Sequence, residues 1–462
     1  MLAPRSASAI NDPVAEDVYP PSSNLWHAAG VLMIVWAFAF LDRQILTILI
    51  ESIHQDIGVS DTQISLVQGV AFSVSSMLAG IALGRLVDVG NRRNILIFGL
   101  LLWSVMTMLC GFAQNFWHLF FARVGVGLGE ACLAPASMSF IADLARPARR
   151  GLAMGIVFAG TAVGSAGSIF FGGMMLEVLG ADGSYSLLGF GPFASWQLIF
   201  MLVGAPGFIA AALMCTLKEP KRRETAQLEA GLGAFLVFFG QQKAAFLLTI
   251  LAFTMTSIIG YAIPVWTPVI LMRAYGVPPG QVGLFVGGTL LVCGVLASTL
   301  GGGLGDKLFR RLSHIGRLGP LLIGYPLQAS VMVAWLFHDS ATWALLAFAL
   351  AGPLLGHLVS SSAYGALSQM VPNELRGKTL AFYALVTSLA GAGLAPTAVA
   401  LITDFVFKDP AMVRYSVLAV CTPAAIAGIL LAIACVKPYR LACVRTAGAV
   451  APRGAVSGAE RP

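Results

Sequence analysis

Charged residues are scarce in this chain: they make up 11% of its 462 residues, whereas 58% are hydrophobic. A soluble globular domain carries about 25% charged residues, so this composition excludes an ordinary soluble protein. Apolar runs of about 20 residues, long enough to cross a bilayer as helices, follow one another along the sequence. We predict twelve spans, at roughly 26–50, 62–87, 94–114, 116–143, 151–178, 196–216, 244–272, 281–305, 318–338, 342–369, 377–402 and 411–436.

Sequence features of secreted and catalytic proteins are also missing. The first 25 residues contain no apolar run, so we expect a tail and not a cleavable signal peptide. The seven Cys include no CxxC pair, and we expect neither disulfides nor a metal site. No P-loop and no nucleophile elbow occur, which excludes a self-contained ATP-driven pump and a hydrolase of that kind. We therefore predict that the protein is not an enzyme and needs no cofactor.

The cations are distributed unequally between the loops. Of the 28 Lys and Arg, Arg273, Lys408 and Arg414 fall on one side of the predicted membrane, and Arg43 and Arg123 lie within spans. The rest lie on the other side, which the positive-inside rule identifies as cytoplasmic. The rule therefore places both termini in the cytoplasm, and the net charge of +7 requires no nucleic-acid partner.

An internal repeat divides the chain into two halves. The segment GRLVDVGNRR after the second span matches GGLGDKLFRR after the eighth, and the matching residues share one offset. The matched residues that we expect to take part in gating are Gly84, Asp88, Arg92 and Arg93 in the first segment, and Asp306, Arg310 and Arg311 in the second.

The repeat predicts five regions. Two six-helix bundles occupy residues 26–216 and 244–437, and cytoplasmic tails occupy residues 1–25 and 438–462. Residues 217–243 are polar and then amphipathic, so we predict a linker with a short helix at the cytoplasmic interface.

The first of these loops resembles the signature loop of the major facilitator superfamily. It departs from that signature at Asn91, where a Gly is usual, and at Val89, where a base is usual. The resemblance covers about residues 26–437. It implies an all-α membrane protein with twelve transmembrane helices in two pseudo-symmetric bundles, which rock about a cavity near the midplane. It also implies a gate in which Asp88 pairs with a loop Arg or caps a helix; the alternative is that these charges only anchor the loop.

Two acids and two bases interrupt the spans of the first half. Asp42 and Arg43 are adjacent in FAFLDRQILTIL, while Arg123 and Glu130 lie seven residues apart on one helix face. A charge at the bilayer centre costs at least about 2.5–3.5 kcal/mol, so we expect the four side chains to neutralise one another inside the bundle. Three roles remain open for them: a packing staple, a proton site at either acid, and an anion site at the two Arg.

The Asp-Arg pair of the first span and the Gly-Glu-Ala of the fourth resemble the spinster-type transporters of that superfamily. This resemblance implies a lysophospholipid or a sphingoid phosphate as substrate, and a link to protons as in some members of the group. If the chain is proton-coupled, we expect the coupling to use Asp42 and Glu130, the two acids within the spans. Organic-anion symporters also carry Asp-Arg in the first span, so a small organic anion such as an aromatic acid or a hexuronate is the alternative substrate. A lipid channel or receptor on the same fold is a second alternative.

The second half offers amphipathic side chains in place of charges. We predict that they line the cavity opposite the charged residues, so that the substrate site combines them with Arg43, Arg123 and Glu130. The amphipathic candidates are Tyr261, Trp266, His357, Ser361 and Tyr364.

Together these inferences predict a secondary active transporter that works by alternating access. The expected substrate is an amphiphile with an anionic or zwitterionic headgroup and one long chain. The expected partners are membrane lipids, this small amphiphile and protons. We expect a monomer in the bacterial inner membrane.

Overall fold

The computed structural model describes residues 20–180, 183–187, 190–222, 232–312 and 317–450. Within them, twelve helices are long and apolar enough to cross a membrane, which confirms the predicted spans and the all-α membrane fold. Their ends agree with the sequence to within a few residues at most positions; the predicted 62–87, for example, is Asp61–Val89. Most of the predicted tails lie outside the described residues, and the domain boundaries remain a prediction.

The first six spans form one bundle. Several spans consist of two consecutive elements, because a proline or a π-helical turn interrupts the regular hydrogen bonds. The elements are α1 (Ser22–Ile57), α2 (Asp61–Ser65), the π-helix η1 (Leu66–Ala71), α3 (Phe72–Val89), α4 (Arg92–Cys110), α5 (Phe116–Glu130), α6 (Leu133–Leu144), α7 (Pro147–Leu179), α8 (Ser195–Gly204) and α9 (Pro206–Cys215).

The last six spans form the second bundle, and α10 (Leu232–Gln241) precedes them in the segment predicted to be a linker. The elements of the second bundle are α11 (Lys243–Arg273), α12 (Pro279–Leu312), α13 (Gly319–Phe337), α14 (Ala341–Ala349), η3 (Leu350–Leu354), α15 (Leu355–Gln369), α16 (Asn373–Thr387), η4 (Ser388–Leu394), α17 (Ala395–Leu401), η5 (Ile402–Phe407), η6 (Pro410–Met412) and α18 (Val413–Val450).

Polar side chains at the loops determine where several helices begin. The Asn91 side chain accepts a hydrogen bond from the Asn94 N–H and so caps α4. Asn91 is the residue at which the loop departs from the superfamily signature, and the cap gives a physical reason for an Asn there. Ser60 forms a capping box with Gln63 at the start of α2, and Gly58, at φ 66°, ends α1 in a left-handed conformation.

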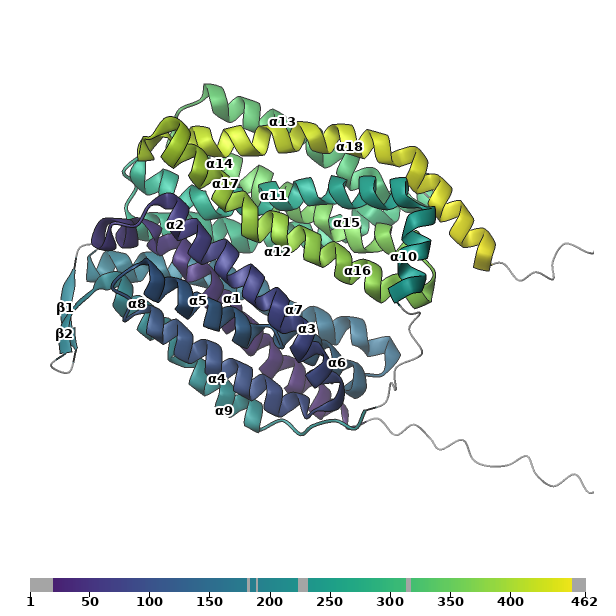
Figure 1. Cartoon of the computed structure of the whole chain (residues 1–462), viewed down its shortest axis with the longest axis horizontal. Helices are drawn as coiled ribbons and strands as arrows, with labels where there is room; N and C mark the ends of the chain where they lie inside the picture. The colour runs from purple at the N-terminus through teal and green to yellow at the C-terminus, as the bar shows by residue number, and fades with distance from the viewer. Residues whose placement is uncertain (1–19, 181–182, 188–189, 223–231, 313–316, 451–462) are drawn as a thin grey trace, which may run out of the picture.

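A β-hairpin between α7 and α8 was not predicted from the sequence. Strands β1 (Ser184–Leu187) and β2 (Phe190–Ala194) pair antiparallel and project beyond the helices (Figure 1). The Phe193 ring meets Phe112 edge-on at 5.7 Å, which packs the hairpin against the end of the first bundle. We use this hairpin to name the two ends of the molecule: the hairpin end carries it, and the opposite, linker end carries α10.

The two bundles lie side by side, with α7 of the first against α12 of the second (Figure 1). Glycines allow this contact in the half nearest the hairpin. A Cβ on Gly283 would lie 2.9 Å from the Ile169 carbonyl oxygen and 3.1 Å from the Gly173 Cα. Because no side chain fits at Gly283 without displacing α7, the two backbones can approach closely.

Candidate functional site

Glu130 lies where the fourth span is interrupted. Helix α5 ends at Glu130, and α6 begins only at Leu133. Pro135 has no N–H to give to the carbonyl of Ala131, so the regular helix cannot continue through this turn. The interruption places the buried Glu130 carboxylate at an irregular point of the span, with α1 beside it.

Glu130 forms an ion pair with Arg43 of α1. The sequence predicted that acids and bases within the spans would neutralise one another, without naming this pair. The Glu130 side chain is 1% exposed, whereas that of Arg43 is 29% exposed. The Arg43 guanidinium also lies over two aromatic rings, 4.6 Å from the Phe40 centroid and 4.3 Å from the Phe72 centroid. Arg43 is therefore held on one side by a buried carboxylate and on another by aromatic faces, while part of it remains accessible.

Asp42 and Arg123 are also adjacent, but their side chains do not form an ion pair. The Arg123 Nη1 donates to the backbone carbonyl of Asp42 at 2.9 Å, and its guanidinium lies 5.1 Å from the Phe200 ring centroid. The Asp42 carboxylate instead accepts a hydrogen bond from the Thr107 hydroxyl at 3.2 Å. Asp42 Oδ1 is buried and has no hydrogen-bond partner among the described residues. The expected neutralisation of two acids by two bases is thus direct only for Arg43 and Glu130.

In the second bundle, Tyr261, His357 and Tyr364 are exposed, and Ser361 is half-buried. His357, Ser361 and Tyr364 lie on one face of α15, since they are spaced four and then three residues apart. The Tyr364 ring packs edge-on against Tyr383 of α16 at 5.6 Å. These residues retain accessible surface that a ligand could cover.

Trp266 differs from the other amphipathic candidates. Its side chain is fully buried, and the indole Nε1 donates to the Pro396 carbonyl at 3.1 Å. In this conformation it joins α11 to α17 within the second bundle and presents no surface to a ligand. The sequence could not show this, because α11 is apolar on all sides and gives no sign of which face points inward.

The predicted gating residues separate into two environments. Arg92 is fully buried and forms ion pairs with Asp143 of α6 and with Glu219, which follows α9. The Arg93 N–H also donates to Glu219, at 2.9 Å. Asp88 is exposed and forms no hydrogen bond or ion pair with another described residue, so the pairing expected from the sequence does not occur in this conformation.

For the other predicted gating residues the structure gives no side-chain contacts. A Cβ on Gly84 would meet open space. The backbone of Asp306, Arg310 and Arg311 forms the last turns of α12, while their side chains lie outside the described part of the chain. The gating role of these residues remains a prediction.

A second set of charges, which the sequence reasoning missed, joins the bundles at the hairpin end. Arg273, the last residue of α11, donates from Nη1 and Nη2 to both carboxylate oxygens of Asp61, at 2.8 and 3.2 Å. Its Nε donates to Glu51 of α1 at 2.9 Å. The Thr62 N–H donates to Asp404 of η5 at 2.8 Å, again between the bundles. We call Arg273, Glu51 and Asp61 the hairpin-end clamp.

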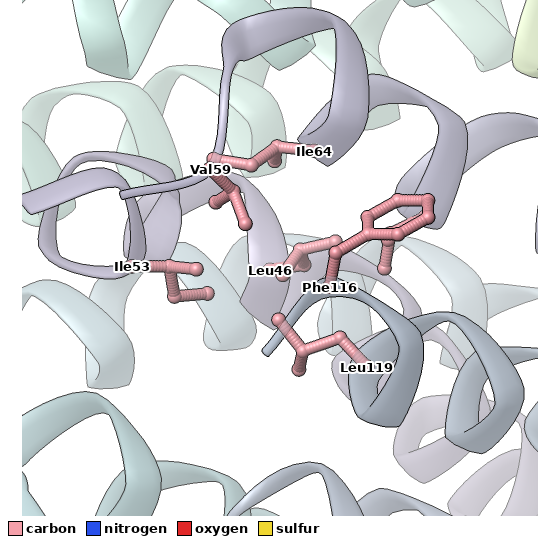
Figure 2. Close-up of a pocket in the computed structure, with 7 residues that line it drawn as sticks. Leu46, Ile53, Val59, Ile64, Phe116 and Leu119 are labelled. Atoms are coloured by element: carbon pink, nitrogen blue, oxygen red, sulfur yellow. The ribbon is translucent and has the colours of Figure 1, made fainter. Parts of the chain in front are cut away.

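A small pocket near the clamp is entirely apolar. Figure 2 shows its lining side chains, which come from α1, the turn after α1, α2, η1 and α5. Because no polar group faces it, it cannot bind an anionic headgroup, and it lies within one bundle. The lining residues are Leu46, Ile53, Val59, Ile64, Val67, Phe116 and Leu119.

The model of the Major Facilitator Superfamily matches residues 32–396. That is most of the chain, and the twelve spans and the paired bundles agree with it. The protein belongs to the major facilitator superfamily and is a membrane transporter.

Individual relatives within the superfamily are similar over most of the chain. The chain is 26% identical over 387 residues to an MFS-type efflux pump of Mycolicibacterium smegmatis, covering 83% of this chain and 86% of the pump. It is 27% identical over 396 residues to Protein spinster homolog 1 of Homo sapiens, covering 81% of this chain and 72% of that protein. The similarity to the spinster homologue confirms the predicted resemblance to spinster proteins within the superfamily.

A solved structure has the same fold. It is the crystal structure of a bacterial homologue of the human lysosomal transporter spinster, in an inward-facing and unoccupied conformation. The TM-score is 0.74 at 24% sequence identity, over 93% of this chain and 99% of that one.

Proposed function

We propose that this transporter moves an amphiphile with an anionic or zwitterionic headgroup and one long acyl or sphingoid chain. The observation that carries the proposal is the unequal chemistry of the two bundles. The first bundle offers a partly accessible cation, Arg43, while the second offers Tyr261 and Tyr364 with exposed aromatic surface. A lysophospholipid or a sphingoid phosphate has this same division between charge and chain.

Arg43 would bind the headgroup. Its accessible donors can form charge-assisted hydrogen bonds with a phosphate or carboxylate oxygen. Such an anion competes with Glu130 for the Arg43 guanidinium, because Arg43 and Glu130 form an ion pair in this conformation. The rings of Phe40 and Phe72 keep Arg43 in place while it exchanges one anion for the other.

The exchange would couple transport to protons. A carboxylate that loses its cation inside the membrane is strongly disfavoured, so Glu130 takes up a proton when the substrate binds Arg43. Asp42 is the second acid that would take up a proton, since its Oδ1 is buried and lacks a partner among the described residues. Arg123 lies beside Asp42, since its guanidinium donates to the Asp42 backbone carbonyl.

The conformation supports alternating access. The hairpin-end clamp and the contact between α7 and α12 hold the bundles together at one end, while α10 and α6 lie apart at the other (Figure 1). The linker end carries most of the cations, so we assign it to the cytoplasm, with both termini on that side of the inner membrane. In this assignment the hairpin-end clamp lies on the side away from the cytoplasm, and the exposed Asp88 lies on the cytoplasmic side.

The test is a series of lysophospholipids with one headgroup and increasing chain length, bound to the purified protein. Each buried CH₂ contributes about 0.8 kcal/mol, so affinity should rise about fourfold per methylene until the apolar surface is filled. Small organic acids should compete weakly or not at all. Equal affinity for short and long chains, or competition by small acids alone, would favour the organic-anion function instead.

A further inference from the structure

A polar group that the proposed function has not used lies next to Arg43. It consists of Gln44 and Thr47 of α1 and Gln68 of the π-helix η1, which we call the glutamine subsite. Gln68 Nε2 donates to the Thr47 hydroxyl at 2.7 Å, and that hydroxyl donates to Gln44 Oε1 at 3.5 Å. Thr47 is 1% exposed, and both Gln are half-buried.

The pairing of the first two spans places this group directly beyond Arg43. The two spans run antiparallel, so a residue one turn later on α1 faces a residue one turn earlier on the second span. Arg43 lies over Phe72, and one turn toward the hairpin end Thr47 bonds Gln68. The glutamine subsite therefore continues the same helix surface on which Arg43 is accessible.

The internal hydrogen bonds determine which groups remain for a ligand. Thr47 takes one N–H of Gln68, which leaves Gln68 Oε1 buried and without a partner among the described residues. Leaving a buried acceptor without a donor costs about 1–3 kcal/mol, so this oxygen favours any ligand that brings an O–H or N–H. Gln44 uses its oxygen on Thr47, and its amide N–H groups remain as donors on the same helix as Arg43.

The subsite also lies where the two bundles meet. Gln68 is inside a π-helical turn, a feature that is frequent at functional sites. The next residue, Gly69, faces the second bundle: a Cβ there would lie 2.5 Å from the Ala392 carbonyl oxygen and 2.8 Å from that of Gly393. A ligand that reaches Gln68 is therefore next to the closed contact that must open for transport.

We propose that the glutamine subsite selects the headgroup by its hydrogen-bond donor. In this proposal, which rests on the proposed function, Arg43 and the Gln44 amide bind the anionic oxygen, and Gln68 Oε1 accepts from an O–H or N–H of the same headgroup. The preferred substrates carry both groups, as a phosphoethanolamine or a phosphoglycerol does. A trimethylammonium headgroup has no such donor and leaves Gln68 Oε1 unpaired.

The N-methylation series of one lysophosphatidylethanolamine tests this directly. The unmethylated, monomethyl, dimethyl and trimethyl headgroups are all zwitterionic, and the first three keep an N–H. Binding to the purified wild type should be similar for these three and should fall about tenfold at the third methyl group. A tenfold change corresponds to about 1.4 kcal/mol, the size of one hydrogen bond to a buried acceptor. A gradual decline with each methyl group would indicate selection by size and would overturn the proposal.

Two variants test whether Gln68 causes the tenfold fall in affinity at the third methyl group, which we call the step. Gln68→Leu should remove it, lowering the affinity for the first three lipids to that for the trimethyl lipid, and Thr47→Val should weaken it by freeing Gln68. Gln328→Leu is the matched control, because Gln328 also leaves a buried Oε1 unpaired but lies on α13 in the second bundle; it should keep the step. A step that persists in Gln68→Leu overturns the subsite alone. If no lysolipid binds and small acids do, the proposed function fails as well.

Discussion

Removing Arg273 should open the hairpin end. Loss of one partner from a buried ion pair costs about 3–5 kcal/mol, because the other charge is left unpaired. The pair with Asp61 fits this case, because the Asp61 side chain is 1% exposed. The Glu51 side chain is 20% exposed, so its pair with Arg273 contributes at most about 1 kcal/mol. We take about 3 kcal/mol for Arg273→Ala, since the acids regain water only when the bundles separate. At about 1.4 kcal/mol per factor of ten, the ratio of closed to open molecules falls about 100-fold.

The assay is a distance measurement between spin labels on the two bundles at this end. Gln55 and Thr342 are exposed and suitable for labelling once the accessible Cys215 and Cys293 have been replaced by Ser. Arg273→Ala should add a longer distance to the distribution. Arg414→Ala is the matched control: Arg414 is a buried Arg near the same end, but it pairs with Asp339 of its own bundle, so the distance should not change.

The result that would refute this reasoning is an Arg273→Ala distribution identical to that of the wild type in folded protein. In that case the clamp would be a consequence of closure and would contribute nothing to it. A longer distance in both Arg variants would instead show general loosening of the second bundle, which is a different cause.

The remaining predictions concern coupling, docking and topology. Glu130→Gln and Asp42→Asn should each abolish the pH dependence of transport while the protein still folds; a wild-type pH profile in both would exclude a carboxyl switch. Gly283→Leu should separate α7 from α12 and lower transport at least tenfold, whereas Gly288→Leu, where a Cβ meets nothing within 4 Å, should be neutral in the same flux assay. A cysteine placed at Lys221 should resist membrane-impermeant reagents in sealed, right-side-out cells, and its labelling there would reverse the assigned topology.

The sequence predicted the spans well, because burial in a bilayer selects composition over long windows and needs no knowledge of partners. It also predicted that the two acids and two bases within the spans would neutralise one another, since a charge inside the membrane must pair. It did not predict which acid pairs with which base, and only Arg43 and Glu130 pair directly. The same reasoning could not place Trp266. An amphipathic side chain on a uniformly apolar helix points inward or outward according to packing with neighbours that the sequence does not name.

The hairpin-end clamp and the glutamine subsite were missed for related reasons. Arg273 ends α11 and Asp61 begins α2, 212 residues away, and we counted Arg273 only to orient the chain. Gln44 and Gln68 are uncharged and lie one on each of two helices, so only the register between those helices brings them together. Which side chains of different helices meet depends on how the helices pack in three dimensions. Local sequence patterns contain little information about that packing.

The buried Arg92 has a consequence for how the chain is made. Its partners are synthesised after it: Asp143 belongs to the fourth span, and Glu219 comes 127 residues later, beyond the sixth. Until Glu219 leaves the ribosome, this end of the first bundle lacks one of its two acids. The first six spans can therefore lock together as soon as Glu219 has left the ribosome, before most of the second bundle has been synthesised.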